Sequence, residues 1–244
     1  MGVSEDRGRS AVVFGARNLG KAVIELLCGQ GWVVAGVARS EATLDGVTVL
    51  GALALRADVT DQASVRQVLE QVATAHGGID LVVNAASAYG GDRSGPFGGG
   101  PIAEAQPEAF DAWAVAPARS AFSFLSATGQ FLLAQGTPAT VVQVTGGSSR
   151  RAAGGRGLWA AGAFGVRAIT QAAALELREH GIHVALLIVD AGIQPLAGGQ
   201  PGQAVDALAD PRELAAAVLF LAEQGARAAT HELQVTPLAE RWVP

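Results

Sequence analysis

The stretch AVVFGARNLGKAVIELLCGQGWVVAGVARS, residues 11–40, decides the fold of this chain. An apolar run (11–14) leads into a glycine turn (15–20), which is followed by a helix-spaced segment (21–27) and a second apolar run (32–37). This order predicts strand, tight turn, helix and strand within about 30 residues. The glycines allow the backbone to bend sharply and to approach a ligand closely, and the start of the helix offers unpaired N–H groups to an anion.

The same layout is typical of a dinucleotide-binding βαβ unit, in which a pyrophosphate lies at the first turn. The second strand ends Val37-Ala38-Arg39-Ser40, without the acidic residue that would bind an adenosine ribose hydroxyl. The guanidinium groups of Arg17 and Arg39 fit a 2′-phosphate instead. The sequence therefore favours NADP(H) over NAD(H). The alternative interpretations assign no function to these residues: the turn is an ordinary α/β turn without a ligand, and the two arginines are solvated surface charges.

Composition sets the class of protein. The chain has 244 residues, of which 50% are hydrophobic and 16% charged, so a single domain over 1–244 with one sizeable core is expected. The net charge is −5 and no basic block is present, which argues against a nucleic-acid partner. The single cysteine, Cys28, excludes an intrachain disulfide, and the four histidines show no metal-ligand spacing, so no metal is predicted.

No feature of the sequence indicates a membrane or secretion. Residues 1–10 are polar, lack the apolar core of a signal peptide and are expected to form a flexible N-terminus. No apolar run reaches the length of a membrane span. The expectation is a cytoplasmic protein that does not act at a membrane.

Strand and helix patterns alternate along the rest of the chain, which predicts a parallel sheet covered by helices on both faces. Strands are expected over residues 52–57, 81–83, 140–144, 184–189 and 233–235, and helices over 62–75, 107–134, 157–180 and 211–223. Asp61 and Asp210 are expected to cap two of the helices. Two Gly/Pro-rich stretches, 87–106 and 192–211, follow strand ends, where open α/β sheets bind ligands. The first is either a functional loop or a surface insertion, and the second is expected to be a substrate lid rather than an insertion.

Several motifs, taken together in order, resemble the short-chain dehydrogenase/reductase family over nearly the whole chain. Phe14–Gly20 is similar to the family's glycine motif but one residue short, and Asp58-Val59 matches a pair that contacts adenine in the family. Asn84–Ser87 resembles its NNAG strand end, and Glu232–Pro237 falls on its last strand. The resemblance implies a Rossmann-type, doubly wound parallel sheet of about seven strands, and a homodimer or homotetramer formed through the helices at 107–134 and 157–180.

The turn, the arginines and the resemblance together predict a set of cofactor-binding residues. They are Gly15, Arg17, Asn18, Leu19, Gly20, Arg39, Ser40, Asp58, Val59, Asn84, Ala85, Ala86, Thr145 and Ile193.

The family's catalytic residues do not carry over to this chain. The family uses a Tyr-x-x-x-Lys pair, and here Trp159 falls on the tyrosine and Ala163 on the lysine. Pro117 falls on the family's asparagine and Gly146 on its serine. An indole N–H donates a hydrogen bond but does not release its proton near neutral pH, so Trp159 does not replace the tyrosine as an acid.

Other residues are weak candidates for the missing chemistry. With a small shift, Ser148 or Ser149 takes the position of the family's serine, although both also suit a turn. Tyr89, the only tyrosine, falls in the loop after the fourth predicted strand. Trp159 is either a ring that orients a substrate or a residue that fills the pocket. The arginines that follow the serines either receive an anionic substrate or form a solvated basic loop.

Three functions remain open for a small-molecule substrate that the sequence does not identify. The first is an NADP(H)-dependent oxidoreductase with a non-standard catalytic site. The second is a catalytically silent NADP(H)-binding protein that senses the cofactor or supports a related enzyme. The third is a non-redox lyase or isomerase on the same scaffold. The first is favoured because it is the family's usual activity, which is an analogy of fold.

Overall fold

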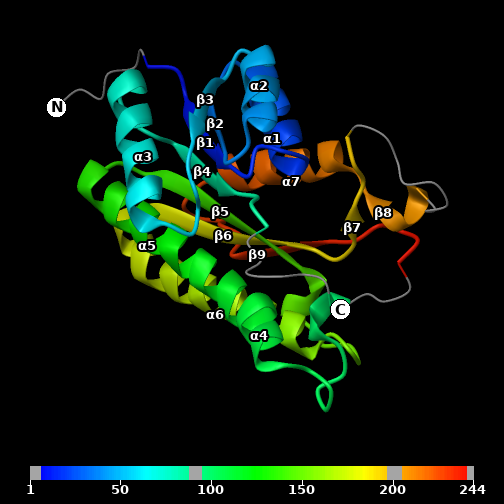
Figure 1. The fold of residues 1–244 in the computed structure, drawn as a ribbon. Coiled ribbons are helices and arrows are strands. Elements are labelled where there is room, and N and C mark those ends of the chain that lie inside the picture. Colours follow the sequence, from blue (N-terminus) through cyan, green and yellow to red (C-terminus); the bar gives the residue numbers. More distant parts are fainter. Residues whose placement is uncertain (1–6, 88–94, 197–204, 241–244) are drawn as a thin grey trace.

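A seven-stranded parallel sheet forms the centre of the molecule (Figure 1). The computed structural model describes residues 7–87, 95–196 and 205–240. The strands are β1 (Ser10–Phe14), β2 (Val33–Ala38), β3 (Leu53–Arg56), β4 (Leu81–Asn84), β5 (Ala139–Gly146), β6 (Ile182–Val189) and β9 (Glu232–Val235). They lie in the order β3-β2-β1-β4-β5-β6-β9. A separate ladder joins β7 (Gly192–Ile193) to β8 (Leu208–Ala209).

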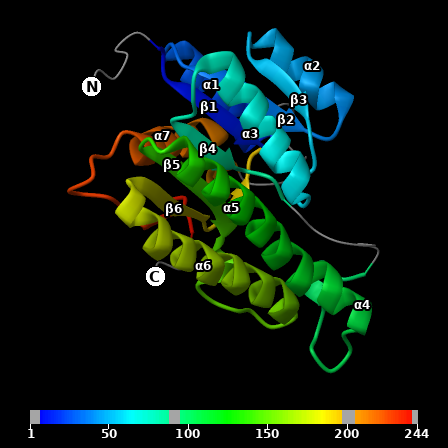
Figure 2. The same ribbon diagram turned by 90° about the vertical axis from the view of Figure 1, so that its left-hand side faces the viewer.

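Helices cover both faces of this sheet, as Figures 1 and 2 show. They are α1 (Leu19–Gly29), α2 (Glu41–Val49), α3 (Gln62–His76), α4 (Pro107–Phe110), α5 (Ala116–Gln135), α6 (Gly157–Leu177) and α7 (Pro211–Ala222). Helix α1 packs against α7 on one face, and α5 packs between α3 and α6 on the other. The predicted Rossmann-type, doubly wound parallel sheet is confirmed. No helix of the described residues is long and apolar enough to cross a membrane.

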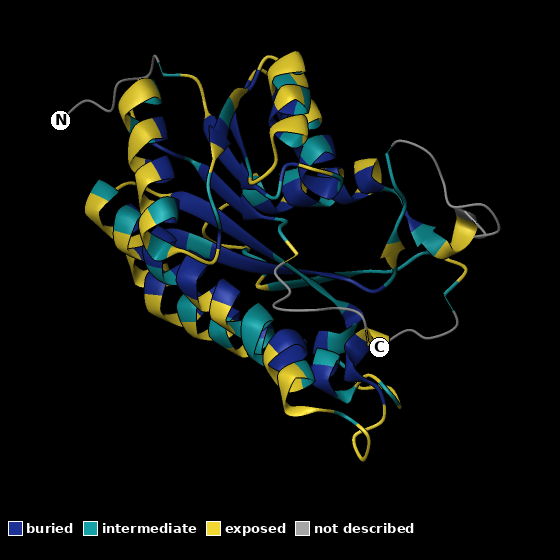
Figure 3. Ribbon diagram, in the orientation of Figure 1, coloured by how far each residue is buried: buried dark blue, intermediate teal, exposed yellow. Residues whose placement is uncertain are grey.

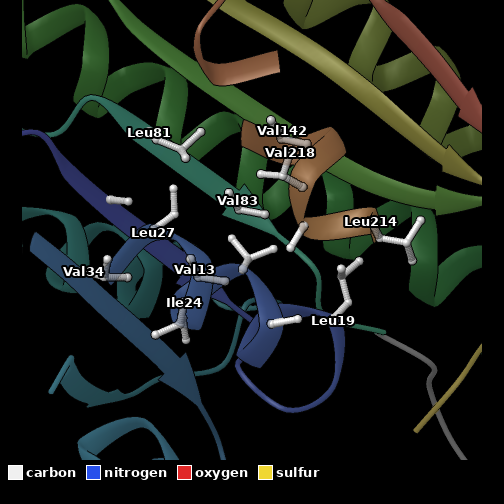
Figure 4. Close-up of a cluster of buried hydrophobic side chains, with 14 of the residues drawn as sticks. Val13, Leu19, Ile24, Leu27, Val34, Leu81, Val83, Val142, Leu214 and Val218 are labelled. Carbon is white, nitrogen blue, oxygen red and sulfur yellow. The ribbon is translucent and has the colours of Figure 1, made fainter. Parts of the chain in front are cut away.

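Alternation along the strands divides the core between the two faces. Val13 and Val83 belong to the cluster beneath α1 and α7, whereas their neighbours Val12 and Val82 belong to the cluster on the α3 and α5 face. Figure 4 shows the first cluster, in which Val13 and Val83 lie near side chains of α1 and α7. The buried sheet between two layers of half-exposed helices is visible in Figure 3. Nearly continuous apolar strands therefore reflect burial on both sides.

The helix predicted over 107–134 forms, and it contains a π-helical turn near its start. Helix α4 is followed by a π-helical turn over Asp111–Val115, and only then does α5 begin. Pro117 lies in the first turn of α5 and has no N–H with which to continue the hydrogen-bond ladder. Gly162 of α6 lies against this turn, since a Cβ added there would be 2.4 Å from the carbonyl oxygen of Trp113. The lack of a side chain at Gly162 thus lets α6 approach this turn closely.

Both predicted caps form, and the first strand begins earlier than expected. Asp61 accepts from the Ala63 N–H at 3.0 Å, and Asp210 accepts from the Arg212 N–H at 2.7 Å. Ser10, assigned from the sequence to a flexible N-terminus, is instead the fully buried first residue of β1. Its N–H donates to the Asp80 carboxylate at 2.8 Å, an interaction that the sequence pattern does not reveal.

Candidate cofactor and substrate site

A cavity of about 740 Å³ opens at the carboxyl ends of the central strands. It lies where the strand order reverses, because β1 is flanked by β2 on one side and by β4 on the other. Open α/β sheets bind their ligands at such a switch point. All the predicted cofactor residues line this cavity except Gly20. The fold therefore brings together residues that lie almost 180 positions apart, from Gly15 to Ile193.

The glycine turn brings its backbone to the cavity wall. Gly15 has a φ of +82°, and a Cβ added to it would lie 2.4 Å from the backbone nitrogen of Ala86. A Cβ at Gly20 would lie 2.3 Å from the Gly15 carbonyl oxygen. Gly20 is therefore needed for the tight turn, although it does not line the cavity. Helix α1 begins after this turn without a side-chain cap and without an acidic residue in its first turn. Its start is therefore suited to an anionic ligand.

Arg39 and Asp58 line the end of the cavity next to β2 and β3, and Arg17 of the glycine turn also lines the cavity. Arg17 and Arg39 are exposed, and Arg39 Nη1 lies 3.5 Å from Asp58 Oδ2. Partial burial opposes ionisation of Asp58, but hydrogen bonds from the N–H and hydroxyl of Thr60, together with the Arg39 charge, lower the pKa of its carboxyl. Asp58 therefore remains charged at neutral pH and orients Arg39.

A buried pair of amides supports the middle of the cavity. Asn84 at the end of β4 donates to Gln143 Oε1 at 3.0 Å, and Gln143 donates to the Val144 carbonyl at 2.9 Å. Asn84 also accepts from the Ala86 N–H at 3.1 Å. Gln143 lines the cavity but was not predicted from the sequence. The sequence did hold a sign of this role, because Gln143 is a single amide within an apolar strand. A polar group buried there requires a hydrogen-bond partner.

The opposite end of the cavity holds the positions of the family's catalytic residues. Trp159, Ala163, Pro117 and Gly146 all line it. Trp159 also packs in an aromatic cluster, with ring centroids 5.3 Å from Phe97 and 5.7 Å from Trp113. These contacts support the interpretation of Trp159 as a wall of the pocket.

Two residues with hydroxyl groups also line the cavity. Ser120 of α5 is only 3% exposed and lines the cavity, as does Thr145 at the end of β5. Neither hydroxyl makes a hydrogen bond within the part of the chain that the structure describes. Ser120 was not singled out from the sequence, because a serine in a helix carries no signal of where it faces. Both side chains remain available to a ligand or water.

Neither of the two serine candidates lines the cavity. Ser149 is fully buried and donates to the Gly146 carbonyl at 2.8 Å, as expected for a turn residue. Ser148 is half-buried but does not line the cavity. Tyr89 lies outside the described residues. Across the described ranges, His, Cys, Asp and Glu side chains form no group that would hold a metal ion.

The arginines after β5 mostly stabilise the protein itself. Arg150 pairs with Glu232 at 3.3 Å, and Arg151 forms a two-pronged ion pair with the nearly buried Asp190. Arg156 instead lies over the ring of Phe97. Two of the three cations are thereby neutralised, which argues against a basic loop that receives an anionic substrate.

Comparison with known proteins agrees with this fold and site. A family model described as short chain dehydrogenase matches residues 9–192. The chain is 28% identical to a sorbitol dehydrogenase of Cereibacter sphaeroides over 184 residues, which is 72% of this chain and 68% of that protein. The chain belongs to the short-chain dehydrogenase family, whose members are oxidoreductases.

Solved structures share the whole fold. An alcohol dehydrogenase from the archaeon Thermococcus sibiricus, complexed with 5-hydroxy-NADP, superposes with a TM-score of 0.78 at 22% identity, covering 97% of this chain and 99% of that one. A metagenomic short-chain oxidoreductase in complex with NADP gives a TM-score of 0.71 at 23% identity, covering 96% and 99%. At this identity the superpositions bear on the fold.

Proposed function

We propose that this protein is an NADP(H)-binding oxidoreductase whose catalytic site differs from the family's usual one. The observation that carries the proposal is the continuous cavity from Arg17 and Arg39, past the glycine turn, to Trp159 and Ile193. Two of the structures that share its fold hold NADP or a derivative of it, which supports a nicotinamide dinucleotide as the cofactor.

The residues along the cavity fit such a cofactor. The glycine turn and the uncapped start of α1 would hold the pyrophosphate, and Arg17 and Arg39 would bind a 2′-phosphate through charge-assisted hydrogen bonds. Ile193, on the segment after β6, lines the far end where a nicotinamide ring would lie. The bound cofactor would supply a hydride to, or accept one from, a substrate carbon.

A carbonyl that accepts a hydride also needs a proton on its oxygen. Asp58 is the only carboxylate among the described lining residues, and it lies beside Arg39 at the other end of the cavity. The hydroxyls of Thr145 and Ser120 are the groups placed to orient a substrate oxygen or a water that delivers the proton. Neither hydroxyl is acidic enough to replace a tyrosine with a lowered pKa, so we expect turnover of simple ketones to be slow.

A second candidate, cofactor binding without turnover, is favoured by the four substitutions at the catalytic positions. Trp159, Ala163, Pro117 and Gly146 supply no proton donor, ammonium, amide or hydroxyl to the cavity. A protein of this kind would sense the cofactor or support a related enzyme.

The test is to measure cofactor binding and cofactor consumption separately. Calorimetry gives the affinities for NADPH and NADH, and absorbance at the nicotinamide band follows NADPH oxidation with a broad carbonyl panel. Tight NADPH binding with measurable oxidation supports the oxidoreductase, and tight binding with none favours the silent protein. A protein that binds neither dinucleotide would refute both.

A further inference from the structure

The side chain of Asn18 joins the glycine turn to a segment almost 180 residues away. Its Nδ2 donates to the Gln194 carbonyl at 3.0 Å, and its Oδ1 accepts from the Leu196 N–H at 2.9 Å. One side-chain amide therefore both donates to and accepts from the backbone of Gln194–Leu196, as a neighbouring strand would. We call this pair of hydrogen bonds the Asn18 clasp.

The clasped segment continues directly from a residue of the cavity. Ile193 lines the cavity and belongs to β7, which pairs with β8 on its other side. The Gln194 N–H donates to the Ala209 carbonyl at 2.9 Å and continues that ladder. The segment is thus held from two directions, by β8 and by the Asn18 clasp. Without the clasp, the Gln194 carbonyl and the Leu196 N–H lose the partners that fix them against the turn.

The role of Asn18 is not the one that its position suggests. Asn18 precedes α1 at the N-cap position, where an asparagine side chain ordinarily accepts from an N–H of the first helical turn. Here it makes no such bond, because its amide is engaged with Gln194 and Leu196. This arrangement leaves the first N–H groups of α1 uncapped, and it ties the wall of the cavity to the turn.

We propose that Asn18 is a positioning residue that fixes the Ile193–Leu196 segment against the cofactor turn, so that the nicotinamide end of the cavity is formed before the cofactor binds. The proposal rests on the proposed cofactor function. Its consequence is that Asn18 strengthens binding of the nicotinamide half and leaves binding of the rest of the dinucleotide nearly unchanged, because preorganisation removes an ordering cost at binding.

Two ligands separate these contributions. NADPH carries the nicotinamide ring, and 2′-phospho-ADP-ribose carries a hydroxyl in its place. In Asn18→Leu, which keeps the number and branching of the side-chain heavy atoms and loses both hydrogen bonds, we expect the NADPH affinity to fall about 10-fold and the affinity for 2′-phospho-ADP-ribose to change by less than about twofold. Asn18→Ala provides a second variant if the leucine disturbs the turn.

The chain offers a matched control. Gln135 forms the same kind of two-way bridge, accepting from the Ile79 N–H at 2.8 Å and donating to the Ile79 carbonyl at 2.9 Å, outside the cavity lining. Gln135→Leu is expected to lower thermal stability without changing the ratio of the two affinities. Hydrogen exchange on the free proteins should show faster exchange over 193–196 in the Asn18 variants and unchanged exchange there in Gln135→Leu.

The outcomes are distinct. If the Asn18 variants lose affinity for both ligands equally, the proposal is overturned, because such a result would assign Asn18 to direct phosphate binding. An unchanged affinity ratio with unchanged exchange also overturns it. A wild-type protein that binds neither ligand refutes the proposed function instead, and exchange over 193–196 in the free protein still decides whether Asn18 holds the segment.

Discussion

Arg39 Nη1 and Asp58 Oδ2 lie 3.5 Å apart across the ends of β2 and β3, at the edge of the cavity. The Arg39 side chain is 73% exposed, so this ion pair contributes little to stability. Its importance lies in orientation. Asp58 holds the guanidinium at the cavity while leaving it open to solvent, where a phosphate can compete for it.

The first prediction concerns the choice of dinucleotide. We expect the wild-type protein to bind NADPH more tightly than NADH, and Arg39→Ala to weaken NADPH binding about 10-fold with little effect on NADH. Calorimetry with both ligands measures this. Arg212→Ala, at an exposed arginine at the start of α7, is the control and should change neither affinity. Equal affinities for the two dinucleotides in the wild type would refute the phosphate-binding role.

The second prediction concerns the missing catalytic pair. We expect no rapid ketone reduction by the wild type, and we expect Trp159→Tyr/Ala163→Lys not to restore full activity. Ala163 is 5% exposed, so a lysine there needs a partner, and Pro117 supplies no side-chain amide. Catalytic groups that act as a unit contribute to the rate in a strongly non-additive way. Restoring two of the four groups is therefore expected to recover little activity.

NADPH oxidation with a carbonyl panel checks this second prediction. Fast turnover of simple ketones by the wild type would show that another group replaces the tyrosine. Ser120→Ala and Thr145→Val would then identify it, and we expect either variant to lower such turnover by about 10-fold or more.

The third prediction is self-association through α5 and α6. Phe122 on α5 is 52% exposed and Phe164 on α6 is 43% exposed, which is unusual for large apolar rings on two helices that pack side by side. We propose that these helices form the interface of a homodimer or homotetramer. Light scattering should report an oligomer for the wild type and a shift toward monomer for Phe122→Glu/Phe164→Glu. A wild-type monomer at micromolar concentration would contradict the proposal.

The fourth prediction is a pH dependence at Glu232. Partial burial opposes ionisation of this carboxyl, but hydrogen bonds from Arg167 and Gln171 and the charges of Arg167 and Arg150 lower its pKa below the ordinary value of 4.5. A carboxyl whose pKa is lower in the folded state than in the unfolded state stabilises the fold above its ordinary pKa. That stabilisation is lost as the pH falls through the lower, folded-state pKa.

Denaturant unfolding of Glu232→Gln tests this dependence. At pH 7 the variant should have a free energy of unfolding lower by about 1–3 kcal/mol, because two arginines lose a charged partner. The difference from wild type should shrink progressively as the pH falls below 4.5. A difference that is the same at pH 7 and in acid would exclude the charge of Glu232 as its cause.

Local patterns in the sequence predicted most of the elements, because strand and helix periodicities are properties of neighbouring residues. They missed α2, where Gly46 and several β-branched residues lower helix propensity. That helix is stabilised instead by Leu44 and Val47, whose burial depends on the rest of the protein. They predicted the helix over 107–134, which forms, but not the π-helical turn at 111–115 inside it.

The sequence by itself determined the sheet, the glycine turn, the family and the absence of a tyrosine–lysine pair, because each of these follows from the types of residue and their spacing along the chain. Only the tertiary structure decided what the polar side chains do. Asn18 bonds to Leu196, and Arg151 to Asp190, across long stretches of chain. A hydrogen bond depends on distances of about 3 Å in space, and these are fixed only when the whole chain is packed.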